Sequence, residues 1–348
     1  MIEECLKKIV SSENLDETEA YHCMEEMISG KASDIHIAAL LASLATKGET
    51  VSEITGFVKA MRAACTPVKV SSDLKLVDAC GTGGDELKTF NVSTSAMIIA
   101  AAAGVYVGKH GNRAVTSSCG GADILEAAGV KIDLDAEKIA QTMEKAGIGF
   151  MFAPNFHPAT KNVMPVRQQL GIRTVFNILG PLTSPVGAQI QLLGVFDPKY
   201  VEIMASVLNN LGVERAMVVH GFDAEEKRGM DEISNVGPTL VAFIDQGEIT
   251  IKKMQPEDFG ITISKSDLIK SPDTLQESLE IFLDVLSGKN ESPEEKARLD
   301  IALVNAGAII YLAGKADDLM QGTEIARETV NSGKAREKLK EFAEISNS

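Results

Sequence analysis

A glycine-rich segment that runs into an acid is the first candidate for chemistry in this chain. The residues GTGGDELKTFNVSTS, from Gly81 to Ser95, follow a β-branched stretch and precede a helical pattern. Backbone N–H groups of such a loop and of the helix start can bind an anion. Neither a Rossmann fingerprint nor a P-loop is present, because Glu86 stands at the third glycine position and no Gly-Lys-Ser/Thr follows. A tight turn with a helix cap is the alternative interpretation. The residues expected at the anion are Gly81, Gly83, Gly84, Asn91, Ser93, Thr94 and Ser95.

Asp85 is unexpected in an anion site, because a carboxylate repels phosphate. A cation between the two groups removes the conflict, and so does a carboxylate that binds the ligand's hydroxyl groups instead. Mg²⁺ is typically held by one or two carboxylates and by ligand phosphates. A second acidic pair, Asp231 and Glu232, follows the strand that ends at His220 and could lie at the same sheet edge. Adjacent acids are also common on solvated loops, so the metal site is predicted from the loop and the pair together.

A second cluster, VGKHGNRAVTSSCGGADILEAAG, spans residues 107–129 and again follows an expected strand. Lys109 and Arg113 bring fixed positive charge into an acidic chain, while His110 and Asn112 can orient a ligand by hydrogen bonds. Gly120 and Gly121 before a helix repeat the anion-binding arrangement. A solvated basic loop remains the alternative.

Arg167, in the helical segment MPVRQQLG, is the third candidate. Its planar guanidinium suits a carboxylate or a phosphate, although a single arginine on a helix is usually a surface residue. His22 and His36 are interpreted as packing or surface residues, and His157, before Pro158, as the start of a helix.

The elements that must position these residues form two classes. The first 65 or so residues are helical throughout, with capping boxes at Asp16/Glu19 and Thr50/Glu53. From residue 74, short β-branched runs alternate with helical segments, which indicates a mainly parallel sheet whose ligands lie beyond the carboxyl ends of its strands. Strands are expected at 74–79, 104–109, 147–153, 190–197, 215–221 and 239–245, and helices between them at 92–103, 122–128, 136–146 and 199–211.

Residues 157–185 interrupt the alternation as a long helical stretch. We expect an α/β fold with flanking helices and a smaller all-helical N-terminal domain. The helical domain takes residues 1–68, joined by the segment near 162–185, and the larger domain takes 69–161 and 186–348. The tail beyond Leu268 is helical, with a helix start at Ser292, Pro293 and Glu295.

Length, net charge, apolar stretches and cysteine spacing disfavour several classes of protein. A chain of 348 residues can bury a sizeable core, and its formal net charge of -15 disfavours nonspecific binding to nucleic acid. The acidic N-terminus does not fit a secretory signal, and the longest apolar stretch, residues 97–107, is too short to cross a bilayer. We therefore expect a cytoplasmic protein without a membrane partner. Its five widely spaced cysteines indicate neither a disulfide framework nor a metal motif.

Seven segments, in order along nearly the whole chain, resemble those of anthranilate phosphoribosyltransferases of the tryptophan pathway: GTGGD, NVSTS, KHGNR, GADILEAAG, HPATKNVMPVR, NILGPLTSP and GMDEIS. The resemblance implies a small helical domain, a larger α/β domain and a homodimer formed through the helical domains. It also implies the reaction, in which anthranilate and phosphoribosyl pyrophosphate give N-phosphoribosylanthranilate and pyrophosphate with Mg²⁺.

The same resemblance implies roles for individual residues. Those on the phosphoribosyl pyrophosphate side are Gly81, Gly83, Gly84, Asp85, Thr89, Asn91, Ser93, Thr94, Lys109 and Gly121. Those on the anthranilate side are Gly81, His110, Asn112, Arg167, Gly180 and Pro181, with Arg167 facing the carboxylate. Ser93, Asp231 and Glu232 would place the metal, and Lys109, Asn112 and Arg167 would carry the reaction.

Some positions depart from the family pattern. Gly121 stands where a serine is frequent, Ser184 replaces a frequent asparagine, and the longer loop at 221–230 brings Glu225 and Glu226 as competing metal ligands. Two other functions remain open. One is a pyrimidine nucleoside phosphorylase of the related fold, which would have no obvious use for Arg167. The other is a non-catalytic phosphoribosyl pyrophosphate sensor, which would bind without turnover.

Overall fold

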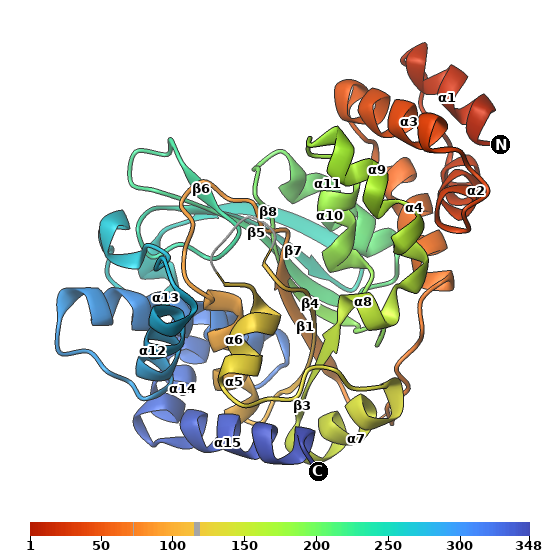
Figure 1. Ribbon diagram of the computed structural model, residues 1–348. Coiled ribbons are helices and arrows are strands. Elements are labelled where there is room, and N and C mark those ends of the chain that lie inside the picture. The colour runs from red at the N-terminus through yellow and green to blue at the C-terminus, as the bar shows by residue number, and fades with distance from the viewer. Residues whose placement is uncertain (72, 115–118) are drawn as a thin grey trace.

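The computed structural model describes residues 1–71, 73–114 and 119–348 (Figure 1). The N-terminal region is helical, as predicted, and its four helices lie together at one end of the molecule (Figure 1). They are α1 (Ile2–Val10), α2 (Glu17–Ile28), α3 (Asp34–Lys47) and α4 (Val51–Ala63). Both predicted capping boxes are confirmed: the Asp16 side chain accepts the N–H of Glu19, and the Thr50 side chain accepts that of Glu53. Local hydrogen bonds therefore set where α2 and α4 begin.

Glu53 does more than cap its helix. Its fully buried carboxylate accepts the N–H of Leu15 at 3.0 Å and that of Thr50 at 2.8 Å, and it pairs with the Lys47 ammonium at 3.0 Å. One buried acid thus joins the loop before α2, the end of α3 and the start of α4.

We expect Glu53→Ala to lower the free energy of unfolding by about 3 kcal/mol, since it removes the carboxylate that pairs with Lys47 and accepts the N–H groups of Leu15 and Thr50. Urea denaturation would measure the loss. Glu25→Ala, at an exposed position of α2, serves as the matched control and should change stability by less than about 0.5 kcal/mol. A similarly small change for Glu53→Ala would contradict the linking role.

The described strands form one mixed sheet. In chain order they are β1 (Leu76–Gly81), β2 (Tyr106–Gly111), β3 (Ile148–Phe152), β4 (Ile190–Gly194), β5 (Arg215–Phe222), β6 (Gly229–Met230), β7 (Thr239–Asp245) and β8 (Glu248–Met254). Their spatial order is β3-β2-β1-β4-β5-β7-β8, and β6 pairs with β5. The first five strands run parallel, whereas β6, β7 and β8 are antiparallel to their neighbours. The predicted mainly parallel sheet is confirmed, and the predicted strands agree to within a few residues.

Alternate residues of the central strands bury against opposite faces of the sheet. On β5, Met217 and Val219 join one apolar cluster, while Ala216 and Val218 join another. This period of two is what a doubly covered sheet requires. Strand β8 lacks this pattern because most of its residues are exposed, and it was not predicted.

Helices cover both faces. One face carries α5 (Val92–Ala102), α6 (Gly121–Ala127), α12 (Leu275–Leu286), α13 (Pro293–Leu312), α14 (Leu319–Asn331) and α15 (Lys334–Ser346). The predicted helical tail is therefore confirmed, including the capping box of Ser292 with Glu295. The other face carries α11 (Tyr200–Asn210), whose apolar residues form one cluster with those of α1 to α4. Helix α7 (Ala136–Ala146) packs near β3 at the sheet edge (Figure 1). None of the described helices is long and apolar enough to cross a membrane.

Residues 157–185 do not form the long helical stretch that was predicted. After α8 (Ala153–Phe156) they make short pieces: a 3₁₀ turn at Pro158–Asn162, α9 (Met164–Leu170), α10 (Phe176–Leu179) and a second 3₁₀ turn at Gly180–Leu182. Pro158, Pro165 and Pro181 each lack the backbone N–H that a continuous helix needs, and α9 ends at Gly171 in a left-handed conformation.

This broken segment packs on the N-terminal helices. The Asn162 amide donates to the Ile28 carbonyl at 2.7 Å, and the Arg62 guanidinium donates to the Leu182 carbonyl at 2.7 Å. These contacts support assigning the segment near 162–185 to the helical domain. The boundaries between the two domains stay a prediction.

Candidate active site

Three loops meet at the carboxyl end of the parallel strands. They follow β1, β2 and β6, and each carries residues singled out in the sequence. The N–H of Gly83 donates to Oδ2 of Asp231 at 2.8 Å, and the N–H of Ser93 donates to Oε1 of Glu232 at 3.1 Å. The ammonium of Lys109 donates to Oγ of Ser93 at 3.2 Å. The sheet therefore brings together residues that lie up to 148 positions apart in the chain.

Glycines allow this close approach. A Cβ atom built on Gly81 would overlap the Asp231 carboxylate, and one built on Gly194 would overlap the Asp231 backbone. The Gly229 carbonyl accepts the N–H groups of Glu86 and Leu87 at 3.2 and 3.1 Å. The glycine loop and the acidic loop are thus hydrogen-bonded to each other at two places.

Two of the amides predicted to hold an anion are occupied by carboxylates here. Gly83 donates to Asp231, and Ser93, in the first turn of α5, donates to Glu232. An anionic ligand that uses these amides has to displace the acids or be joined to them through a cation. The repulsion between carboxylate and phosphate that Asp85 indicated in the sequence therefore applies to Asp231 and Glu232 as well.

The three acids of this edge destabilise one another's charged forms. Burial and the neighbouring Asp231 raise the pKa of Glu232 well above its ordinary value. Burial also raises the pKa of Asp231, while burial and then Asp231 raise the pKa of Asp85 to about 7. Oδ2 of Asp85 is buried without a hydrogen-bond partner among the described residues. Negative charge is therefore concentrated where a cation would relieve it.

Protein side chains do not enclose a metal by themselves at this edge. Within residues 1–71, 73–114 and 119–348, no three His, Cys, Asp or Glu side chains are grouped as a ready-made metal site. Two carboxylates and a serine hydroxyl suit Mg²⁺ nevertheless, because this ion usually completes its shell with water and substrate phosphates. The residues present fit a metal that arrives with its ligand.

Lys109 is buried at this edge and forms no ion pair with a described carboxylate, although its charge acts on the nearby Asp78, Asp231 and Glu232. It is 4% exposed, and its ammonium donates to the Ala79 carbonyl at 2.7 Å and to Ser93. Among the described residues no carboxylate lies within ion-pair distance of it. An ammonium has three protons, so one remains available to an anionic ligand.

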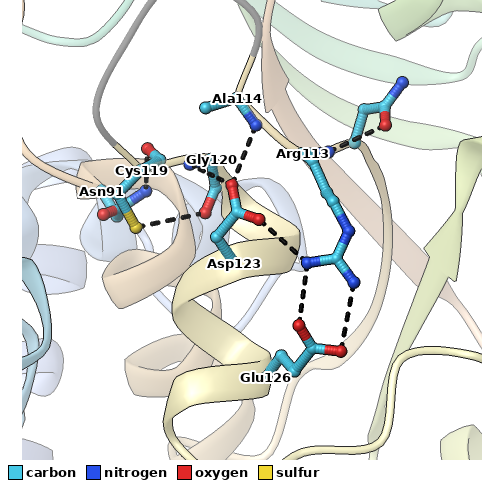
Figure 2. Close-up of polar contacts among 8 residues, drawn as sticks. Asn91, Arg113, Ala114, Cys119, Gly120, Asp123 and Glu126 are labelled. Atoms are coloured by element: carbon cyan, nitrogen blue, oxygen red, sulfur yellow. Dashed lines mark hydrogen bonds and ion pairs between the residues drawn. The ribbon is translucent and has the colours of Figure 1, made fainter. Parts of the chain in front are cut away.

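The positive charge that Arg113 brings to this cluster is engaged in ion pairs. Its guanidinium makes two hydrogen bonds with the Glu126 carboxylate, at 2.8 and 3.1 Å, and one with Asp123 at 3.0 Å (Figure 2). The local charge is therefore balanced by acids of α6. Residues 115–118 of the same cluster lie outside the described residues.

Asp123 also forms hydrogen bonds with two residues that follow β2, Ala114 and Gly120. Its Oδ2 accepts the N–H groups of Ala114 and Gly120, each at 2.9 Å (Figure 2). The Asn91 amide donates to the Cys119 carbonyl at 3.1 Å, which links this loop to the glycine loop. The Gly120 amide is thus used within the protein.

A pair of buried histidines marks another part of this edge. Nδ1 of His110 lies 3.3 Å from the Gly180 carbonyl, and the His110 and His157 rings are 5.0 Å apart. Burial and the neighbouring His157 lower the pKa of His110 to about 3, so its imidazole is neutral. Because the carbonyl only accepts, Nδ1 carries the proton and Nε2 presents a free lone pair. Neither Nε2 atom has a partner among the described residues.

The interpretation of His157 as a helix start is confirmed, and the structure adds a contact that the sequence did not indicate. It does precede a 3₁₀ turn, but its ring is 6% exposed and packs against His110. Its position five residues beyond the end of β3 was a usable signal, since ligands of a parallel sheet bind beyond such ends.

Arg167 lies on α9 and has no acidic partner among the described residues. Its guanidinium sits 5.0 Å from the centre of the Phe176 ring and donates to Sδ of Met164 at 3.4 Å. Burial lowers its pKa. A half-buried guanidinium with such weak partners is suited to an incoming carboxylate.

The other predicted residues are placed less distinctively. Thr89 forms an isolated bridge with Lys270, and the exposed Asn112 accepts the N–H of Arg113 at 2.8 Å. A Cβ atom on Gly121 would lie 3.3 Å from Oγ1 of the buried Thr94. The Pro181 carbonyl accepts from the Gln191 side chain at 2.7 Å.

The competing acids Glu225 and Glu226 are occupied elsewhere. Glu225 pairs with Lys227 at 2.7 Å on an exposed turn, and Glu226 of the same turn pairs with Lys253 of β8. They are therefore weaker candidates for a metal than the pair at 231 and 232.

A further buried acid, Asp78, lies on β1 behind this edge. It is 1% exposed, and burial raises its pKa to about 6 against the opposing effect of Lys109. A carboxyl whose folded pKa is raised binds its proton more tightly in the folded state. The free energy of unfolding therefore falls as pH rises from about 4 to about 6.

Replacing Asp78 should reduce this dependence, to which the raised pKa values of Asp85, Asp231 and Glu232 also contribute. A shift from 3.8 to about 6 corresponds to about 3 kcal/mol at pH 8, and we expect Asp78→Asn to reduce the slope between pH 4 and 6. Guanidinium denaturation at several pH values would measure it, with Asp273→Asn at an exposed position as control. An unchanged slope would show that Asp78 is not its source.

A pocket also opens on another part of the described structure. Its volume is about 350 Å³, and it opens beside Arg215, Asp245 and Tyr311, where β5 begins and β7 ends. This is the end of the sheet opposite to the loops described above, so the pocket belongs to a separate surface.

Comparisons with known proteins match the whole chain. Residues 3–65 match the helical bundle domain of a glycosyl transferase family, and residues 73–336 match its a/b domain. An anthranilate phosphoribosyltransferase of Methanothermobacter thermautotrophicus is 58% identical over 337 residues, which cover 97% of this chain and 96% of the relative. That of Methanosphaera stadtmanae is 45% identical over the full length of both chains.

Solved structures agree. The crystal structure of anthranilate phosphoribosyltransferase from Thermus thermophilus is 39% identical, with a TM-score of 0.90 and 99% of each chain covered. The enzyme from Saccharomyces cerevisiae in complex with phosphoribosyl pyrophosphate and Mg is 25% identical, with a TM-score of 0.88 over 99% of this chain and 98% of that one. The yeast enzyme has also been solved with 4-fluoroanthranilate.

Proposed function

This chain belongs to the anthranilate phosphoribosyltransferase family, and on that premise we propose that the carboxyl edge of its sheet binds both substrates of the family's reaction. The chain transfers the phosphoribosyl group from phosphoribosyl pyrophosphate to the amine of anthranilate, a step of tryptophan biosynthesis. The observation that carries the site is that Gly83 and Ser93 donate to the acids of the 231–232 loop, while Lys109 donates to Ser93.

The donor half of the site is proposed around the glycine loop. Its backbone and the start of α5 offer N–H groups, and Lys109 supplies a buried ammonium with a free proton. The residues proposed to contact phosphoribosyl pyrophosphate are Gly81, Gly83, Gly84, Asp85, Thr89, Asn91, Ser93, Thr94, Lys109 and Gly121.

We propose that Ser93, Asp231 and Glu232 hold Mg²⁺ together with the donor substrate. Their hard oxygen atoms suit this ion, and the burial that raises the pKa values of Asp231 and Glu232 favours a cation beside them. Mg²⁺ supplies compensation of the charge on the departing pyrophosphate when it is bound.

The acceptor half is proposed around Arg167 and the histidine pair. The Arg167 guanidinium binds the anthranilate carboxylate through two hydrogen bonds. The neutral His110 offers its Nε2 lone pair to the amine, and His157 packs behind it. Asn112, Gly180 and Pro181 complete this side, and Gly81 lies between the two halves.

The chemistry follows from these groups. The anthranilate amine is a weak nucleophile, so pyrophosphate departs from C1 of the ribose early, through an oxocarbenium-like transition state. Lys109 and the loop N–H groups stabilise the charge that develops on the leaving group. The acceptor residues hold the amine against C1, and such orientation contributes roughly 7 to 11 kcal/mol at best. Closure of the helical segments over the site would exclude the water that competes for C1.

We also propose that the protein works in the cytoplasm as a homodimer joined through its helical domain. Val10 and Ile35, on the N-terminal helices, are 66% and 79% exposed. Apolar side chains so exposed suit an interface between copies. Light scattering of the purified chain at several concentrations tests the dimer.

Loss of anthranilate fluorescence tests the reaction. The chain, anthranilate, phosphoribosyl pyrophosphate and Mg²⁺ are mixed, and each is omitted in turn. Decay that requires all four supports the proposal. A flat signal with phosphoribosyl pyrophosphate still bound would support a sensor, and phosphate-dependent cleavage of uridine would support the phosphorylase.

A further inference from the structure

Arg173 reaches from the acceptor side of the site to the glycine loop. It lies in the short turn between α9, which carries Arg167, and α10. Its Nη2 donates to the Gly84 carbonyl, and its guanidinium stacks 4.4 Å from the centre of the Phe196 ring. Neither substrate half described above uses this residue.

The contact with Gly84 determines which way a peptide group faces. In a trans peptide the C=O of one residue and the N–H of the next point in opposite directions. With the Gly84 carbonyl turned toward Arg173, the N–H of Asp85 points away from it. Gly83 and Gly84 have φ values of 68° and 79°, a region that glycine enters and leaves readily, so this peptide can flip unless a partner holds it.

Arg173 is itself held firmly. The Phe196 ring supports its flat guanidinium, and the N–H of Phe196 donates to Oγ1 of Thr82 at 3.0 Å. The N–H of Thr82 donates to the Gly194 carbonyl at 3.0 Å. The end of β4 and the residues after it thus support the glycine loop directly at Thr82 and, through Arg173, at Gly84.

The approach of Arg173 also depends on the glycine. A Cβ atom on Gly84 would lie 3.2 Å from Nη2 of Arg173, so a side chain there would crowd the guanidinium. No described carboxylate forms an ion pair with Arg173. Its full charge therefore acts on the Gly84 carbonyl and on the loop around it.

We infer that Arg173 is a positioning residue for the donor half of the site: it holds the Gly84–Asp85 peptide so that the loop's N–H groups face the diphosphate. The inference rests on the proposed function, because it takes the glycine loop to be the diphosphate subsite. It adds a physical link between the segment that carries Arg167 and the loop that binds the donor.

Calorimetric binding of two probes, each with Mg²⁺, tests this role without turnover. Inorganic pyrophosphate reports on the loop, and ribose 5-phosphate reports on the rest of the donor subsite. We expect Arg173→Ala to weaken pyrophosphate at least tenfold and ribose 5-phosphate less than twofold. Equal losses for both probes, or none for pyrophosphate, would overturn the inference.

Three further comparisons separate positioning from charge and from damage to the fold. Arg173→Lys keeps the charge but loses the stacked fork, and full recovery of pyrophosphate binding in it would overturn the inference. Millimolar guanidinium ion should partly restore Arg173→Ala, and failure to do so would count against it. Phe196→Leu should show a smaller loss in the same direction. Arg336→Ala, at an exposed position of α15, is the matched control.

The outcome is independent of the transferase assay. If the parent chain bound pyrophosphate but did not consume anthranilate, the proposed reaction would fail while the pyrophosphate comparison still tested Arg173. If the parent consumed anthranilate and Arg173→Ala bound pyrophosphate normally, only the inference would fail.

Discussion

The double variant Asp231→Asn/Glu232→Gln is expected to lose roughly 10³-fold in kcat/KM, because the charge of the departing pyrophosphate loses its metal-held compensation. Both replacements keep an oxygen that can accept the N–H of Gly83 or Ser93, so the loop contacts can persist. Steady-state rates across a Mg²⁺ titration would measure the loss. The dependence of the rate on Mg²⁺ should flatten as well.

The thermal stability of the ligand-free protein should not fall in this variant, although its activity does. It removes two buried like charges, so the ligand-free protein should melt no lower than the parent. Phosphoribosyl pyrophosphate with Mg²⁺ raises the melting temperature of the parent by mass action, and this rise should largely disappear.

A matched control is available on the same loop. Glu225→Gln/Glu226→Gln makes the same change in charge at an exposed turn and should keep the parental Mg²⁺ profile. A normal profile in the 231/232 variant with a loss in the 225/226 variant would move the metal to the longer part of the loop.

Arg167→Ala is the second variant with a large expected effect. It removes the proposed two-point contact with the anthranilate carboxylate, worth about 2 to 3 kcal/mol, so the KM for anthranilate should rise roughly 30- to 150-fold. The KM for phosphoribosyl pyrophosphate should change little. Initial rates with each substrate varied in turn separate the two.

Two further variants test whether this effect is specific to the Arg167 guanidinium. Gln168→Ala, the exposed neighbour on α9, tests whether the helix itself is disturbed and should behave like the parent. Arg167→Lys keeps the charge without the fork and should fall between parent and alanine. Equal rises in both KM values for Arg167→Ala would rule out a specific contact with the carboxylate.

Much of the fold was predictable because its determinants are local. The capping boxes of α2, α4 and α13 depend on residues three positions apart, and the central strands show themselves by β-branched runs. The predictions failed where local signals mislead. Residues 157–185 have a helical composition, but prolines at 158, 165 and 181 divide them into short pieces. The exposed β8 exists through pairing with β7 rather than through its own pattern.

The site was predictable as a set of motifs but not as a set of partners. Asp85, Lys109 and Asp231 could be selected from the sequence because their residue types suit phosphate and magnesium chemistry, and because each follows a strand. The sequence could not show which charged residues of the site form ion pairs. Arg113, selected for its fixed positive charge, is paired with Glu126, whereas Lys109 is buried without an ion pair among the described residues.

The sequence by itself therefore determined the fold class, the motifs and the family resemblance, since these depend on residue types at short spacing. The tertiary structure decided which amides face Asp231 and Glu232, that His157 lies against His110, and that Arg173 holds Gly84. The physical reason is that the positions of these loops depend on the order of the strands in the sheet. Its order β3-β2-β1-β4-β5-β7-β8 is set by pairing between strands distant in the chain, and only that pairing brings their loops to one edge.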